Sequence, residues 1–236
     1  MKNKLDAQRI PINYASAIGW ALEELGENKE RIFAELGINI DDLKEPEASI
    51  QGTQYKKLIE RGISLNDSAT PFSFLIAKHI KITSHGILGL AAMSADNLGE
   101  ILELSKFFPL LMPGVEFNYS IHNGNVICEF NPIEELGIEA AASIVEIYVL
   151  IFLKFNFYLA EPMHERRVFF SHKISYDKAV YYKHFGCYVE FECNTNRIII
   201  PEQYLKISLI SSDPSTLNFS KKYLEQGLKQ LSKRNH

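Results

Sequence analysis

Apolar residues recur every three or four positions along the first third of the chain. This is the period of an amphipathic helix that packs on a core. The expected helices cover residues 12–25, residues 29–36, a stretch from residue 54 onward, and residues 72–80. We expect Asn28 and Thr53 to cap two of them, and Asp41 and Asp42 to lie in a connecting loop. The N-terminal region is therefore predicted to be a bundle of short helices.

A helical run continues over residues 98–108, and the apolar period then changes from about 3.6 residues to two. Alternating residues over 115–121 and 126–130 flank Asn123-Gly124, a dipeptide typical of a two-residue hairpin turn. Three further strands and one helix are expected downstream. The strands cover residues 167–170, 188–193 and 197–200, and the helix covers residues 176–185 and ends at Gly186.

The most apolar segment covers residues 138–159. Glu146 and Lys154 bracket its longest apolar run, residues 147–153, which is too short to cross roughly 30 Å of hydrocarbon. We therefore expect a buried core helix and no membrane span. At 100° per residue, Glu139, Ser143, Glu146 and Lys154 share one narrow polar side of it.

Helices thus alternate with mostly antiparallel strands, without the regular β-α-β repeat of a doubly wound fold. The predicted fold class is α+β, an N-terminal bundle of short helices followed by a mostly antiparallel sheet packed against helices. The expected divisions are a helical subdomain over residues 1–85, a sheet subdomain over 86–217 and a basic linker helix over 218–236. The basic residues of this last segment are Lys221, Lys222, Lys229, Lys233 and Arg234. An ordinary solvated C-terminal helix is the alternative.

The composition is that of a folded protein, with 46% hydrophobic and 23% charged residues. A formal net charge of -4 argues against a chain-wide surface for binding nucleic acid. The three cysteines are too few for a disulfide scaffold and lack zinc-ligand spacing. The N-terminus carries no apolar segment of signal-peptide length, so we expect a cytoplasmic protein.

Motifs of common enzyme classes are missing from the sequence. It contains no GxSxG elbow, no phosphate-binding GxxxxGK[ST] loop, no HExxH and no GxGxxG after a strand. His79 and His85 lie six residues apart, which is not a ligand spacing on one helical face. Cys187 and Cys193 flank an expected strand and are interpreted as small apolar core residues. We expect no catalytic residue, no metal and no cofactor.

One group of residues allows two interpretations. The candidate ligand-binding residues are Met93, Phe107, Phe108, Met112, Phe117, Glu146, Tyr148 and Phe152, with Phe155 beside them. Such an aromatic set is either core or the wall of a small-molecule pocket. The carboxylate of Glu146 must be solvated, paired or functional, because burying it alone is costly. It therefore faces solvent or a structural partner, or it borders a ligand cavity.

Three stretches carry a resemblance to a known family. They are residues 86–102, which read GILGLAAMSADNLGEIL, then residues 182–191 with Phe185-Gly186-Cys187, and finally Asn196 and Asp213-Pro214 further on. Together they resemble the N-terminal effector domain of AraC/XylS-type bacterial transcription regulators, the group labelled arabinose-binding. Tyr188 stands where the family usually has Pro, and residues 207–209 replace its Pro-Leu-Pro.

The resemblance implies an effector-sensing and dimerising domain of a DNA-binding regulator. Its two helix-turn-helix units are then expected in a C-terminal region after His236. The apolar candidate pocket implies an unknown small-molecule effector of apolar character and not a sugar, with a polar end near Glu146. Two alternatives stay open. One is a small apolar-ligand-binding protein or enzyme that uses Glu146, and the other is an assembly module whose core is full.

Overall fold

The computed structural model describes residues 4–45, 47–110 and 114–234. The N-terminal elements are α1 (Lys4–Ala7), β1 (Arg9–Pro11), α2 (Ile12–Glu24), α3 (Lys29–Glu35), η1 (Ile40–Lys44), β2 (Ser49–Gln51), α4 (Gly52–Leu65), α5 (Phe72–His79) and η2 (Ile82–His85). Next come α6 (Gly86–Met93), α7 (Leu98–Glu103), η3 (Leu104–Leu110), β3 (Val115–His122), β4 (Asn125–Pro132), η4 (Glu134–Leu136), α8 (Ile138–Lys154) and η5 (Phe155–Phe157). The remaining elements are β5 (Arg167–Phe169), α9 (Lys178–Phe185), β6 (Tyr188–Glu190), β7 (Arg197–Pro201), η6 (Glu202–Lys206) and α10 (Pro214–Arg234).

The N-terminal helices form the predicted bundle. Helices α4 and α5 pack against α8, and α2 packs on both of them. Two local predictions were wrong. Helix α4 begins at Gly52, because Gln51 and Gln54 cap it reciprocally, so Thr53 lies inside its first turn. Asp41 and Asp42 lie in the 3-10 helix η1, whose cap is the Asn39 side chain, and not in an irregular loop.

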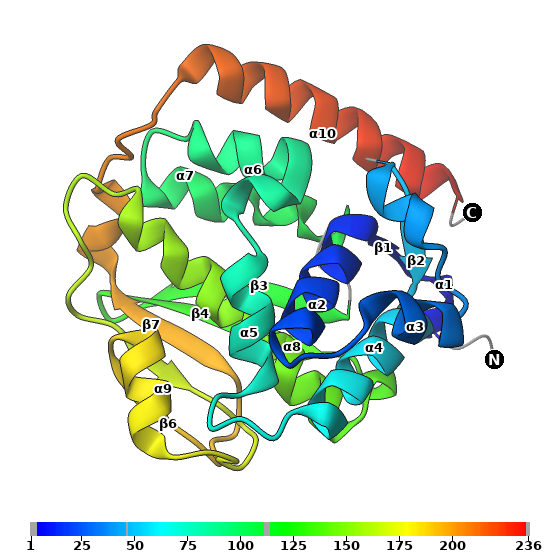
Figure 1. Cartoon of the computed structure of the whole chain (residues 1–236). Helices are drawn as coiled ribbons and strands as arrows, with labels where there is room; N and C mark the ends of the chain where they lie inside the picture. The colour runs from blue at the N-terminus through cyan, green and yellow to red at the C-terminus, as the bar shows by residue number, and fades with distance from the viewer. Residues whose placement is uncertain (1–3, 46, 111–113, 235–236) are drawn as a thin grey trace.

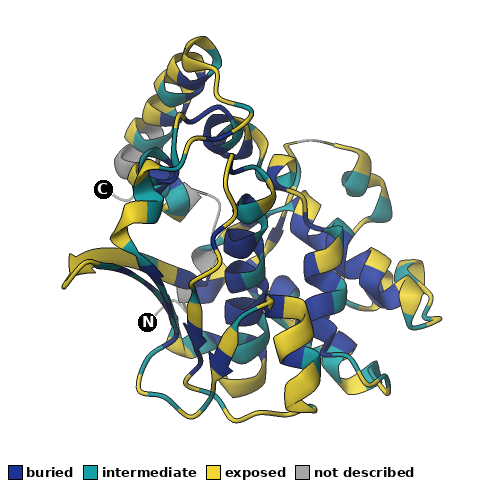
Figure 2. Ribbon diagram, turned by 90° about the vertical axis from the view of Figure 1, so that its left-hand side faces the viewer, coloured by how far each residue is buried: buried dark blue, intermediate teal, exposed yellow. Residues whose placement is uncertain are grey.

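Helix α8 is the central element, with the N-terminal bundle on one side and strand β4 on the other. Figure 2 shows buried residues concentrated where the helices meet one another and the curved sheet. The helix ends at Lys154, earlier than the predicted residue 159. The side chain of Asn156 accepts a hydrogen bond from the backbone N–H of Met163, and the chain tightens into η5. On the polar side of α8, Glu146 and Lys154 face α5, because both bond to it, whereas Glu139 is exposed.

The sheet has the order β3-β4-β7-β5-β6. Its pairings are antiparallel except for that of β5 with β6, which is parallel. The turn between β3 and β4 confirms the hairpin prediction, since Asn123 and Gly124 both have positive φ, 49° and 71°. Val126, Cys128 and Phe130 alternate along β4 and are buried on the side that meets α8.

Helix α10 runs along the outside of α6 (Figure 1). Asp213 caps its N-terminus by accepting bonds from the backbone N–H groups of Ser215 and Thr216, at 3.0 and 3.1 Å. These bonds hold the pKa of the Asp213 carboxyl below its usual value. Pro214 suits the first helical position, where no N–H is needed. The Asp-Pro pair therefore fixes where α10 starts, four residues before the predicted start of the basic helix at residue 218.

Other boundaries also differ from the prediction. The helix expected over residues 98–108 is regular only to Glu103 and continues as η3, which contains Pro109. Helix α9 starts at Lys178 and not at residue 176, because the Asp177 side chain caps it. Strand β6 ends at Glu190 and not at residue 193. Its alternation therefore does not extend to Cys193.

The α+β class, with a mostly antiparallel sheet packed against helices, is confirmed. The division at residues 85 and 217 stays a prediction. In the part of the chain that the structure describes, no helix is long and apolar enough to cross a membrane. Residues 235 and 236 at the end of the basic segment lie outside the described residues.

Candidate functional site

An apolar cavity lies between α6, α8, η3 and strand β4. Its volume is about 60 Å³. Helix α8 supplies Tyr148, Ile151 and Phe152, which lie on one face because their spacing is three and four residues. Phe130 of β4 closes the side toward the sheet. The site is therefore built where the central helix, the sheet and α6 meet.

Helix α6 forms the opposite wall with Leu88, Gly89 and Ala92. Gly89 allows the close approach of the preceding turn, since a Cβ there would lie 2.0 Å from the carbonyl oxygen of Ile82. Any larger residue would force α6 away from η2, and the cavity wall would move with it. Phe108 of η3 completes the wall.

The structure brings only part of the predicted residue set to this cavity. Phe108, Tyr148 and Phe152 line it, together with Phe155. Phe117 lies behind them, with its ring centroid 5.0 Å from that of Phe108 and 5.2 Å from that of Phe130. The wall does not include Phe107, which is fully buried, or Met93, which packs partly buried on the core. Met112 lies outside the described residues. A ligand-binding role for the lining residues stays a prediction.

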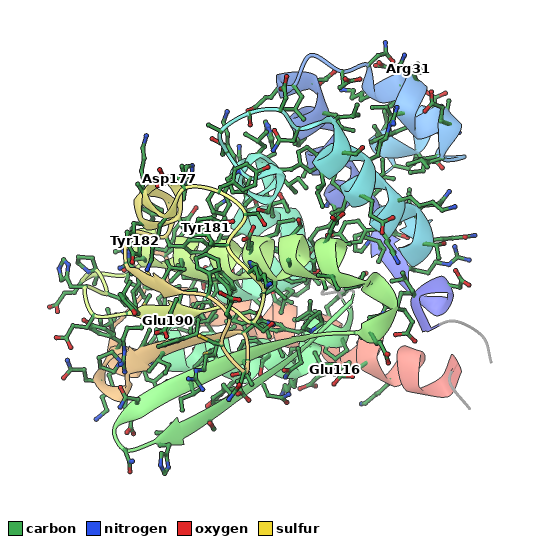
Figure 3. The ribbon with its side chains drawn as sticks, turned by 90° about the horizontal axis from the view of Figure 1, so that it is seen from below. Arg31, Glu116, Asp177, Tyr181, Tyr182 and Glu190 are labelled. Carbon is green, nitrogen blue, oxygen red and sulfur yellow. The ribbon has the colours of Figure 1, made fainter. Side chains whose placement is uncertain are left out.

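Glu146 belongs to a separate buried cluster. Its side chain accepts hydrogen bonds from the Ser73 hydroxyl of α5 and pairs with Nε2 of His172 at 3.0 Å. Tyr181 on α9 (Figure 3) lies in the same cluster. Burial and the Glu146 carboxylate raise the pKa of the Tyr181 hydroxyl. The expectation that Glu146 offers a polar end to the aromatic pocket was therefore wrong, because its oxygens bind structural partners on the other face of α8.

His85 brings a polar group to the cavity wall, which the sequence analysis did not foresee. Its Nδ1 lies 2.8 Å from the hydroxyl of Tyr14 on α2. Its Nε2 is buried and has no hydrogen-bond partner among the described residues. Burial, with a smaller contribution from the charge of Lys154, lowers the pKa of His85 to about 4. The imidazole is therefore neutral at physiological pH.

Tyr14 connects this histidine to two further tyrosines, Tyr55 of α4 and Tyr148 of α8. The ring centroid of Tyr14 lies 6.3 Å from that of Tyr55 and 6.5 Å from that of Tyr148. Burial raises the pKa of all three hydroxyls, so they remain protonated. His85 and Tyr148 of the cavity wall are thereby in contact with Tyr14 of α2, which in turn contacts Tyr55 of α4.

The wall formed by α6 is also bonded to the start of α10. The Ser211 hydroxyl donates to the carbonyl oxygen of Met93 at 2.5 Å, and the Asp213 N–H donates to that of Ser94 at 3.0 Å. Further along, Lys221 of α10 pairs with Glu100 of α7 at 2.6 Å. A displacement of α6 would therefore act directly on α10.

Comparison with known proteins identifies the family of this domain. Residues 26–209 match the model of the arabinose-binding domain of AraC transcription regulators, an N-terminal domain. The chain belongs to this family. The match covers the sheet, most of the N-terminal bundle and every residue that lines the cavity, whereas Tyr14, Ser211 and Asp213 lie outside it.

Two relatives from Pseudomonas aeruginosa agree with the AraC assignment. The ornithine utilization regulator is 22% identical over 236 residues, which cover 98% of this chain and 69% of the relative. The solved structure of the transcriptional regulator CdpR shares the fold with a TM-score of 0.58 and 16% identity. That match covers 85% of this chain but only 61% of the CdpR chain, so both relatives are longer regulators.

The AraC-type motifs have structural explanations in this chain. Gly186 ends α9 in the left-handed conformation, with φ 61°, and its N–H donates to the carbonyl oxygen of Tyr182. Asn196 holds the sheet, because its side chain accepts the N–H of Ser171 and donates to the carbonyl oxygen of Phe130. These residues position elements of the fold and line no part of the apolar cavity.

Proposed function

We propose that this AraC-type domain senses an apolar small molecule, which it binds in the cavity between α6 and α8. The position of the cavity is the observation that carries the proposal. Helix α6 forms one wall of it, and the same helix holds the start of α10 through Ser211 and Asp213. The wall is almost entirely hydrocarbon and aromatic carbon, which suits an aliphatic or aromatic effector and not arabinose.

The small size of the cavity determines how an effector would act on the domain. Pockets that enclose drug-sized ligands measure roughly 300–1,000 Å³, whereas this one measures about 60 Å³. An effector of more than a few atoms therefore has to move α6 or Phe108 outward. Because the core is close-packed, this displacement reaches α10. The effector shifts the population of the two arrangements only as far as it binds one of them more tightly.

In a regulator of the length of its relatives, α10 leads toward the C-terminal part of the protein. DNA is then bound by that part, outside this chain, through two helix-turn-helix units. A cytoplasmic location belongs to the same proposal, because the effector and the DNA must both reach the protein. We assign no enzymatic activity to the domain. The carboxylate of Glu146, the candidate for catalysis, is bonded to Ser73 and His172 away from the cavity.

Self-association is the second part of the proposal. Phe219 and Tyr223 lie one turn apart on the outer face of α10 and are 65% and 57% exposed. Apolar side chains at this spacing are typical of a helix that pairs with another helix. Sedimentation of the domain should show a dimer, and Phe219→Ser with Tyr223→Ser should give a monomer. A monomeric wild-type domain at micromolar concentration would contradict this part.

A thermal-shift screen with a filled-cavity variant tests the sensor function. Apolar compounds should raise the melting temperature in proportion to their concentration. Ala92→Leu places a larger side chain in the cavity wall and should abolish these shifts. Ala141→Leu is the matched control, since Ala141 packs partly buried on α8 but does not line the cavity. Stabilisation by sugars alone, or equal shifts in the Ala92→Leu variant, would contradict the proposal.

A further inference from the structure

We propose that the effector carries one uncharged hydrogen-bond-accepting oxygen, which accepts a bond from the Nε2–H group of His85. This inference rests on the proposed function, because it names the chemistry of a ligand in the same cavity. It makes His85 the residue that selects an oxygen-bearing effector among apolar molecules of similar shape. The ligand class is a ketone, ester or ether on an aliphatic or aromatic body.

The first step of the argument is the position of Nε2. His85 lines the mostly apolar wall, and its Nε2 atom is buried and lacks a partner among the described residues. Buried polar groups in folded proteins are nearly always hydrogen-bonded, so an unpaired one calls for a specific explanation. A ligand that supplies the missing partner in the cavity is such an explanation.

The second step assigns the proton on the imidazole. The ring is neutral, and its Nδ1 lies 2.8 Å from the Tyr14 hydroxyl. A phenol O–H is a stronger acid than a neutral imidazole N–H, and an imidazole nitrogen is the better acceptor. Tyr14 therefore donates to Nδ1, which leaves the proton on Nε2. The unpartnered group of this cavity-lining residue is then a donor, and its ligand must accept.

The third step concerns the charge of the ligand. The wall contains no lysine or arginine among the described residues. The nearby Lys154 uses its ammonium group to bond the carbonyl oxygens of Ala77 and Ile80. An anionic ligand would therefore be buried without a counter-charge, which is costly. The oxygen that meets His85 is thus uncharged.

The bond also links the ligand to the N-terminal bundle. Nδ1 and Nε2 are two ends of one rigid ring, so an oxygen that fixes Nε2 also fixes the ring against Tyr14 of α2. A ligand with a correctly placed oxygen would hold α2, His85 and α6 together. An isosteric hydrocarbon would fill the same cavity without doing so.

Acetophenone and α-methylstyrene are suitable probes, because they share one shape and differ in a C=O against a C=CH₂ group. Wild-type domain should bind acetophenone about tenfold more tightly, the effect of one net hydrogen bond. His85→Asn keeps an amide near the position of Nδ1 but cannot reach the cavity, so it should bind both probes equally. His85→Gln places an amide N–H near the position of Nε2 and should restore the preference.

Imidazole ¹⁵N spectra of the wild-type domain give a second test that needs no variant. They should show the proton on Nε2, and the Nε2 signal should shift when acetophenone is added. A proton on Nδ1, or equal affinities of the two probes for the wild-type domain, would overturn the role of His85 and leave the sensor proposal intact. Binding of neither probe would overturn both.

Discussion

Glu146 and Tyr148 lie two residues apart on α8 and face opposite sides of the helix. Tyr148 lines the apolar cavity, and Glu146 bonds to Ser73 and His172 on the other side. At 100° per residue, two positions rotate a side chain by about 200°. Helix α8 therefore carries a hydrogen-bonded polar cluster toward α5 and one wall of the small apolar cavity toward α6, and the two can be tested separately.

Glu146→Ala should destabilise the fold without changing ligand specificity. The variant leaves the Ser73 hydroxyl and the His172 imidazole without their shared partner in a buried site. Removing one partner from such a buried cluster lowers the free energy of unfolding by about 3 kcal/mol. Urea unfolding measures the free energy of unfolding, and Glu139→Ala, at an exposed position of α8, is the control. A change below about 0.5 kcal/mol for Glu146→Ala, the size of an ordinary surface substitution, would contradict the structural role.

Acidification should weaken the fold through His85. Burial lowers its pKa from 6.5 to about 4. The unfolded chain therefore binds the proton more readily, and the free energy of unfolding falls as the pH drops from about 6.5 to about 4. The full loss is about 3 kcal/mol, at about 1.4 kcal/mol per pKa unit.

Urea unfolding at pH 7 and pH 5 tests the contribution of His85. Wild type should lose more stability between the two values than His85→Gln, which has no ionisable group at this position. The other titrating groups are the same in both proteins and serve as the internal control. Equal losses would show that His85 is not buried in its neutral form.

Lys154→Met should destabilise the contact between α5 and α8. The ammonium group of Lys154 bonds the carbonyl oxygens of Ala77 and Ile80 at the C-terminal end of α5. Its removal takes a charged hydrogen-bond donor from two part-buried carbonyl groups, at a cost of about 2 kcal/mol. Lys78→Met is the control, because Lys78 is exposed and pairs with Glu24 on the surface. Equal effects of the two substitutions would refute the capping role of Lys154.

Gly186→Ala should cost more stability than Gly26→Ala. Both glycines have positive φ, 61° at Gly186 and 79° at Gly26. Alanine at either position therefore costs roughly 1 kcal/mol of backbone strain. A Cβ on Gly186 would also lie 2.9 Å from Nη2 of Arg166, whereas nothing lies within 4 Å of one on Gly26. The difference between the chemical unfolding midpoints of the two variants measures the cost in stability of displacing the Arg166 side chain. A larger loss for Gly26→Ala would contradict this account of the Phe-Gly-Cys motif.

The sequence predicted most elements because their signals are local. The Asn123-Gly124 turn, the Asn28 cap and the apolar period of α2 all depend on residues within a few positions. The boundaries that failed depend on distant or side-chain-specific bonds. The clearest example is the end of α8, where Asn156 bonds the N–H of Met163.

The site was predictable only in part. Tyr148, Phe152 and Phe155 belonged to the predicted aromatic set and line the cavity, but periodicity cannot show which neighbour covers which face of a helix. The sequence therefore left Glu146 between a structural partner and a ligand cavity, and its contacts with Ser73 and His172 identify the partner. His85 was missed because its importance comes from Tyr14, 71 positions away, and from an Nε2 atom without a partner. The one available signal was its place directly before the family-like stretch that starts at Gly86.

Hydrogen–deuterium exchange with and without bound acetophenone tests the central claim, that the cavity communicates with α10. We predict altered exchange in α6 and in the first turns of α10, with no change in α3, which lies in the N-terminal bundle and contributes nothing to the cavity wall. Altered exchange confined to the cavity wall, with α10 unchanged, would contradict the claim that this domain transmits ligand binding through α6.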